Sequence, residues 1–187
     1  MANKDAAFGL KAIGKVGQNR DNQGLSEYSI AASSDAIFQN DPVMMAATGK
    51  IVVGTAAAVL LGSLNGVFFT DATTNKPTYA NHLNASNAAT DIVGFVSDDP
   101  YERFEIQSDA AFAESEVGLN ADIVYAAGSS PNFISKVELD HSDLATTGEQ
   151  LRVIGISKDP ENNTAGSADT NVVVIINEHF LKGTTGI

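Results

Sequence analysis

The sequence lacks cysteine and tryptophan, and only 7% of its 187 residues are aromatic and 18% are charged. Without cysteine, the chain has neither a disulfide scaffold nor a thiolate metal site. Its three histidines, His82, His141 and His179, stand apart in the chain and show no metal-ligand spacing. We therefore expect neither a metal nor a cofactor.

Long apolar runs are also missing. The longest, Ala56–Leu61, is far shorter than the roughly 20 residues that a helix needs to cross a bilayer, and the first residues have no apolar run of the kind found in secretory signals. No phosphate-binding loop and no nucleophile elbow is present. A net charge of −12 disfavours binding to nucleic acid or anionic lipid. We expect no nucleic-acid partner, no membrane association and no enzymatic activity.

Two polar clusters contain catalytic residue types without the spacing of a catalytic site. The stretch 140–143 holds Asp, His and Ser, but a triad is assembled from separate segments of the chain. The acidic stretch 98–102 lacks the alternating ligand positions of a calcium loop. We interpret it as a hairpin turn with solvated charges; the alternative is an acidic hydrolase that uses Asp98, Asp99 or Glu102.

Short β-rich runs separated by Gly, Asn, Asp and Pro fill most of the chain, a pattern typical of sandwiches and barrels. We predict a mainly β fold, with a sandwich or barrel-like (β-tulip-like) body of short antiparallel strands and at most one or two short helices. The expected strands are Glu27–Ala31, Pro42–Ala46, Lys50–Thr55, Val67–Thr70, Asp91–Val96, Arg103–Gln107, Asp122–Ala126, Phe133–Leu139, Gln150–Ser157 and Asn171–Asn177.

Some of these runs also predict which side chains are buried. The apolar run 172–176 predicts a strand that is covered on both faces. Phe68 and Phe69 are adjacent, so one ring is expected to point into the core and the other outward, where it is available to a partner. A short helix is expected over Asp109–Val117, and the polar stretches Asp71–Ala89 and Asp159–Thr170 are expected to be loops.

A weak internal repeat links two strand ends. The segments 93–100 and 154–160 both run from an apolar strand with an internal glycine into Ser-x-Asp-Pro or Ser-Asp-Asp-Pro. Because Asp-Pro favours a turn, and each segment precedes another strand, the repeat predicts two similar hairpins.

The first 25 residues differ in charge from the rest. They hold four basic and two acidic side chains, a net charge of +2, whereas the remaining 162 residues have a net charge of −14. With four glycines and few apolar residues, this segment cannot form a core of its own. We expect an extended N-terminal arm over 1–25, ordered by a neighbouring molecule, and a β-rich body over 26–187. The alternative is that the arm folds back on its own body as an edge strand.

The arm carries a resemblance to a known family. The run 5–11, Asp-Ala-Ala-Phe-Gly-Leu-Lys, followed by Gly14 and Gly17, resembles the opening of the decoration (cement) proteins of tailed bacteriophage heads. Further blocks that are similar to this family lie, in the same order, at 94–96, 98–100, 104–107, Gly155 and 174–179. The long polar insertion at 71–89 departs from the family pattern.

The resemblance implies a structural virion protein, made in the host cytoplasm, that sits on the outer surface of the capsid. Such a protein stabilises the expanded head by bridging subunits of the major capsid protein, as a homotrimer or other small homo-oligomer. We expect the arm to make the capsid contacts, with apolar anchors and charge contacts at Phe8, Leu10, Lys11, Ile13, Lys15 and Val16. The alternative is a head fibre or adhesin-like module that recognises a host surface glycan through the loop 71–89.

Overall fold

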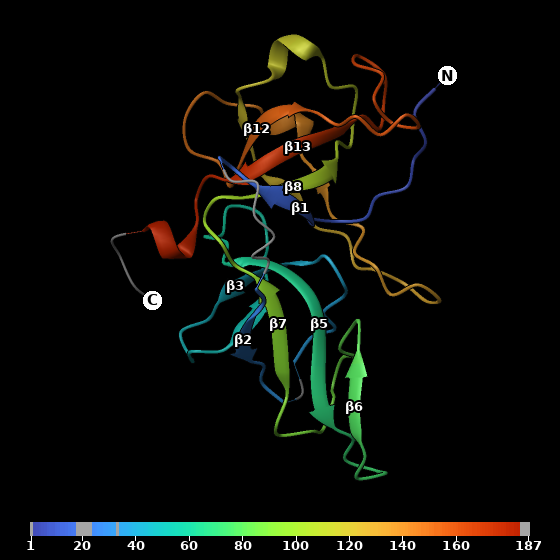
Figure 1. Ribbon diagram of the computed structural model, residues 1–187, viewed down its shortest axis with the longest axis vertical. Helices are drawn as coiled ribbons and strands as arrows, with labels where there is room; N and C mark the ends of the chain where they lie inside the picture. The colour runs from blue at the N-terminus through green and yellow to red at the C-terminus, as the bar shows by residue number, and fades with distance from the viewer. Residues whose placement is uncertain (1, 18–23, 33, 184–187) are drawn as a thin grey trace.

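The computed structural model describes residues 2–17, 24–32 and 34–183, which form two antiparallel sheets in separate halves of the molecule (Figure 1). The first sheet has the strand order β1 (Lys11–Lys15), β8 (Glu102–Gln107), β13 (Asn171–Ile176), β12 (Leu151–Ile156), β9 (Asn120–Ala121). The second has the order β2 (Ser26–Ser29), β7 (Val93–Ser97), β5 (Gly62–Thr70), β3 (Pro42–Met45), β4 (Ile51–Val53), with β6 (Pro77–Ala80) also paired to β5.

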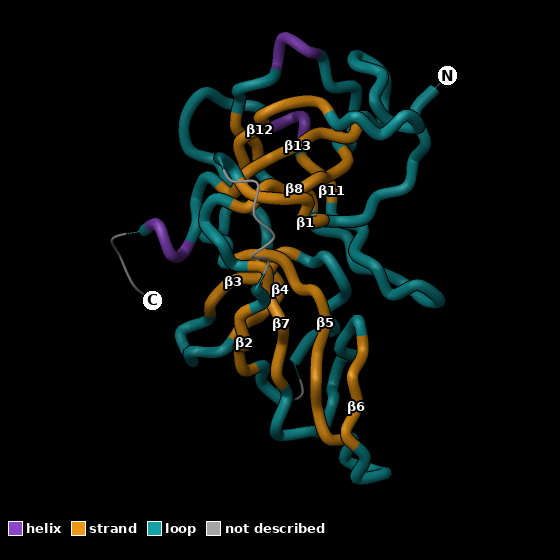
Figure 2. Tube along the Cα trace, in the orientation of Figure 1, coloured by secondary structure: helices purple, strands orange, loops and turns teal. Residues whose placement is uncertain are grey.

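The remaining elements are short. A two-stranded sheet of β10 (Ile123–Val124) and β11 (Glu138–Leu139) packs with the first sheet, and three single-turn 3-10 helices complete the described chain (Figure 2). These helices are η1 (Glu114–Glu116), η2 (His141–Asp143) and η3 (Phe180–Lys182). Within the described ranges, no helix is long and apolar enough to span a membrane.

The structure confirms the mainly β prediction, and the sheets do not close into a barrel. Each of the ten expected ranges overlaps a strand, although the ranges 122–126 and 133–139 contain only the two-residue strands β10 and β11. The helix expected over 109–117 is reduced to η1. Its first half is held instead by backbone hydrogen bonds from Asp109 N to Leu139 O at 3.1 Å and from Gly166 N to Phe112 O at 2.7 Å. Because Phe112 is fully buried, its packing overrides the local helix signal.

Two expectations about connections are wrong. The stretch 71–89 contains β6, which the polar residues around it hid from the sequence pattern. The stretch 98–102 is not a hairpin, because β7 belongs to the second sheet and β8 to the first, so the chain crosses between sheets here. The matching segment 154–160 does open a hairpin, because β12 pairs with β13. The two similar sequences therefore lead into different strand connections, and the internal repeat is limited to the local sequence.

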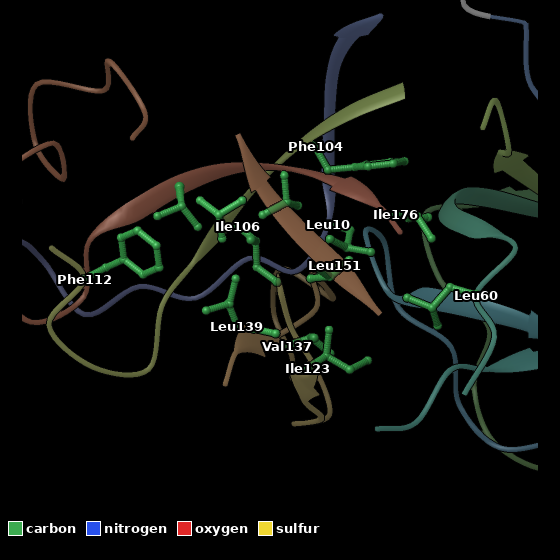
Figure 3. Packing of buried hydrophobic residues seen from close by; sticks show 14 residues of the cluster. Leu10, Leu60, Phe104, Ile106, Phe112, Ile123, Val137, Leu139, Leu151 and Ile176 are labelled. Carbon is green, nitrogen blue, oxygen red and sulfur yellow. The ribbon is translucent and has the colours of Figure 1, made fainter. Parts of the chain in front are cut away.

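Each half has its own hydrophobic core. The first core lies between the first sheet and the β10–β11 pair, and Figure 3 shows Phe104, Ile106 and Leu151 within it. It also receives Leu10 from the N-terminal segment and Leu60 from the chain that leads into β5. The second core lies against the second sheet, where Phe180 packs on it from the C-terminal end.

The two halves are joined by short segments, because part of each half packs against the core of the other. Leu60 N donates to Glu178 O at 3.0 Å, and Phe180 N donates to Leu60 O at 2.8 Å. The buried Gln150 side chain donates from Nε2 to Thr55 O at 2.8 Å and to Ala58 O at 2.6 Å. Because each half inserts apolar residues into the core of the other, the two sheets are parts of one packed unit.

Candidate interaction surfaces

The N-terminal segment lies against its own chain. Residues 11–15 form β1, an edge strand that pairs antiparallel with β8, and Leu10 is fully buried in the first core. Leu10 N donates to Asn40 O at 2.9 Å, and Ser63 Oγ donates to Leu10 O at 2.6 Å. A glycine is required at position 9, where φ is +75° and a β-carbon would overlap Asn40 O and the Ser135 side chain.

These contacts correct two expectations for the segment. A neighbouring molecule is not needed to order residues 2–17, because the alternative, an edge strand on the protein's own body, is what the structure shows. Leu10 cannot be a capsid anchor, because its side chain already fills the core. Residue 1 and residues 18–23, which complete the predicted arm, lie outside the described residues.

The other five predicted contact residues differ in how available they are. Ile13 is 42% exposed and Val16 is 47% exposed, so both offer apolar surface to a partner. The Lys11 side chain is exposed, with its Nζ 3.4 Å from Glu105 Oε2 and 5.8 Å from the centre of the half-buried Phe8 ring. We call Lys11, Ile13, Lys15 and Val16 the N-terminal edge.

Lys15 is already paired within the protein. Its Nζ lies 2.6 Å from Asp99 Oδ2. This hydrogen bond raises the pKa of Lys15 and lowers the pKa of Asp99. The next carboxylate, Asp98, accepts hydrogen bonds from Ser26 Oγ at 2.9 Å and Tyr28 OH at 2.6 Å. Burial, together with Asp98, raises the pKa of Tyr28. Thus Asp98 and Asp99 fasten β2 and β1 at the crossing between the sheets.

The outer side of the first sheet is apolar and basic. The face opposite the core bears Ile175, which pairs with Arg152 on β12. Since Val174 pairs with Phe104, continuing the register by one residue places Arg103 on the other side of Ile175. The residues Arg103, Arg152, Ile154, Val173 and Ile175 of this side are called the basic face. Glu105, which pairs with Val173, lies on the same side, but it is buried and its Oε2 is 3.4 Å from Lys11 Nζ. Beside it, residues of β1, β8, β12 and β13 line an open hollow of about 600 Å³.

The charged residues that are exposed on the strands of this sheet are all basic. The basic residues are Lys11, Lys15, Arg103 and Arg152, and the only acidic ones are Glu102 and Glu105, which are both buried. The apolar run 172–176 was expected to be covered on both sides. That expectation is wrong within this chain, because Val173 and Ile175 are only half-buried and Ile154 of the adjacent strand is 39% exposed.

The outer side of the second sheet is aromatic. Phe69 lies in the core and its neighbour Phe68 points outward, as the alternation predicts. Tyr79 on β6 is 76% exposed, and its ring centre is 4.7 Å from that of Phe68 and 6.4 Å from that of Phe95 on β7. Glu27 on β2 pairs with Phe95 and is exposed. We call Glu27, Phe68, Tyr79 and Phe95 the aromatic face.

The histidines have structural contacts. His82 stacks on Phe133 with ring centres 3.8 Å apart, and His141 Nε2 lies 3.2 Å from Glu116. His179 is buried and accepts a hydrogen bond from Leu181 N at its Nδ1, which caps η3; burial lowers its pKa to about 4. In the stretch 140–143, Asp140 Oδ1 accepts hydrogen bonds from the Ser142 amide and hydroxyl and so caps η2.

Among the described residues, two clusters of three acidic side chains bring together residues that are far apart in sequence. They are Asp5, Glu138 and Asp169, and Asp122, Asp143 and Glu149. Within each group the carboxylate oxygens lie within 4.8 Å of one another. Burial and, to a smaller extent, neighbouring carboxylates raise the pKa values of Glu138 and Glu149. Three ligands fall short of the six to eight oxygens that calcium takes.

Comparisons with known proteins give no relative: no family model matches the chain, and no curated protein or solved structure is similar enough to indicate a relationship. The functional assignment therefore rests on the residue blocks of the sequence and on the surfaces described above.

Proposed function

We propose that this protein is a non-enzymatic decoration protein that binds the outside of an expanded phage head and stabilises it by bridging major capsid protein subunits. The observation that carries the proposal is the N-terminal edge. It belongs to the segment with the family resemblance, and it presents Lys11 and Ile13 on an edge strand, with Val16 directly after it, all held on the body of the protein. Because the segment is already ordered, little conformational entropy is lost when it binds.

The mechanism is thermodynamic linkage: a protein that binds only the expanded state of the shell stabilises that state. A protein that binds across neighbouring subunits only in the expanded lattice stabilises that lattice in proportion to the free energy of binding. Each apolar side chain that becomes buried contributes roughly 1.5–3 kcal/mol before ordering costs. Several copies held together multiply the residence time through effective concentration. The acidic surface that faces away from the shell keeps particles apart in solution.

Point variants of the N-terminal edge test the proposal. Deleting residues 1–17 would also remove Leu10 and β1, so a loss of binding would reflect unfolding. We expect Ile13→Asp combined with Val16→Asp to weaken binding to purified expanded heads by at least about 10-fold, a loss of roughly 1.4 kcal/mol. Val117→Asp is the matched control, because Val117 is exposed and directly follows η1, which contacts β12, three strands from β1. Equal affinity of both variants and the wild type would refute the proposal.

A second candidate function is favoured by the aromatic face. An adhesin-like module that binds a host glycan needs an exposed ring on which a sugar can stack, and Tyr79 offers one within the stretch 71–89. Arrays of surface glycans probed with the wild type and with Tyr79→Ser test this function. Binding that is lost in Tyr79→Ser, while expanded heads are not bound by either form, would favour the module over the decoration protein.

A further inference from the structure

The outer sides of the two sheets are complementary in charge. The strands of the second sheet contain no Lys or Arg, and their single acidic residue, Glu27, stands on the aromatic face. The exposed charges on the strands of the first sheet are all positive, and Arg103 and Arg152 flank Ile175 on the basic face. One chain therefore carries both a basic apolar surface and an acidic aromatic one.

Both faces expose apolar side chains that a sheet normally covers. An all-apolar strand such as β13 is typical of sheets that are covered on both sides, yet one side of β13 stays partly open. On the second sheet, Tyr79 is the most exposed large hydrophobic residue in the described chain. Contiguous exposed apolar surface with a charged rim marks a protein interaction site.

We propose that the basic face of one copy binds the aromatic face of a second copy. In this contact, the guanidinium groups of Arg103 and Arg152 lie over the rings of Tyr79, Phe68 and Phe95, where arginine and aromatic rings attract each other. Glu27 of the second copy compensates one of their two positive charges. Ile175 between the arginines and Ile154 beside Arg152 pack on the rings, as in two sheets that stack about 10 Å apart.

A second copy fits better than another occupant because the complement is present on the chain itself. Arg152 and Ile154 lie on β12, three strands from β1, which is roughly 14 Å at the usual strand spacing. The self-contact can therefore be altered at β12 without changing the N-terminal edge. The inference does not rest on the proposed shell binding, and it can hold if that function fails.

The geometry of assembly follows from the use of two different surfaces. In such a head-to-tail contact, every added copy leaves one basic and one aromatic face free, until the chain of copies closes into a ring. Such a contact gives a closed ring if the rotation between copies closes and an open chain if it does not, and either complex dissociates as salt screens the contact between charges.

Two variants, each with one face disabled, test this directly in full-length protein. The first is Arg152→Glu with Ile154→Asp, both on β12, and the second is Glu27→Lys with Tyr79→Ser. By light scattering coupled to gel filtration, the wild type should be an oligomer, and each variant alone should be a monomer with association at least about 30-fold weaker. Mixed in equal amounts, the two variants should form a dimer of one copy each that does not grow, because only one intact pair of faces remains. Lys136→Glu, on an exposed loop, should assemble like the wild type.

The mixture also controls for folding, since a misfolded variant could not regain a partner. A wild type that stays monomeric at about 100 μM in low salt, or variants that still self-associate, would overturn the inference. So would a mixture that stays monomeric when circular dichroism shows both variants to be folded. In those cases the aromatic face remains available to the glycan of the second candidate function.

Discussion

Two buried titratable groups should oppose each other in the dependence of stability on pH. Asp41 is fully buried, and its Oδ2 accepts a hydrogen bond from Phe38 N at 2.8 Å. Burial raises the pKa of Asp41 to about 6, although hydrogen bonds from Ser135 and Phe38 act in the other direction. Burial and the nearby Lys182 lower the pKa of His179 to about 4, against the pull of Asp98 and Asp99.

Stability rises with pH where the unfolded chain binds more protons than the folded protein, and it falls with pH in the opposite case. Between pH 3.8 and about 6, the folded protein keeps a proton on Asp41 that the unfolded chain has lost, so stability falls as pH rises. Between about pH 4 and 6.5, the unfolded chain holds a proton on His179 that the folded protein excludes, so stability rises with pH. At about 1.4 kcal/mol for each tenfold change in proton affinity, each effect reaches up to about 3 kcal/mol, and in the wild type they nearly cancel.

Single variants should separate the two effects. Relative to the wild type, Asp41→Asn should gain up to about 3 kcal/mol of unfolding free energy as pH rises from 4 to 6.5, because the cost of ionising Asp41 is gone. His179→Gln should lose a similar amount relative to the wild type over the same range, because the unfolded chain no longer takes up that proton as the pH falls. The assay is urea unfolding followed by circular dichroism at steps of pH, with Asp35→Asn as an exposed control. Profiles of both variants that run parallel to the wild type would refute the reasoning.

Three further predictions concern the folded body. Leu10→Ala should lower the unfolding free energy by about 2–5 kcal/mol in urea titration, because it empties a fully buried site in the first core, whereas Ile13→Ala should change it by less than about 1 kcal/mol. Gly9→Ala should lower the melting temperature, because φ is +75° and the added carbon meets Asn40 and Ser135; an unchanged melting temperature would contradict the close packing. Tyr79→Ser should leave the unfolding free energy within about 0.5 kcal/mol of the wild type, since its exposed ring contributes little to the core; a larger loss would identify the aromatic face as structural.

Local patterns revealed the strands well, because alternation and turn residues act over a few positions. The run 103–107 gives β8, with Phe104 and Ile106 in the core, and the split between Phe68 and Phe69 holds. The same patterns gave wrong predictions where contacts between residues far apart in the sequence determine the local structure. Burial of the Phe112 side chain in the core replaces the expected helix around it, and β6 forms in a polar stretch because β5 supplies a partner strand.

The N-terminal segment shows the same limit for the candidate site. Composition indicated that residues 1–25 cannot build a core alone, and it selected Ile13 and Val16, which are exposed. It could not show that Leu10 fills a core built by other segments, because nothing near Leu10 in sequence reports on Phe104 or Ile176. The aromatic face was found only in part, since Tyr79 and Phe95 come from separate strands.

The sequence by itself determined the class of structure, the strand content and the unequal distribution of charge, because these depend on residue types and on spacing along the chain. The tertiary structure alone decided which strands pair, that β7 and β8 part into different sheets, and that Arg103, Ile175 and Arg152 form one row. The reason is physical: register and sheet membership are set by contacts between residues far apart in the chain, and these contacts fix which side of each strand is buried.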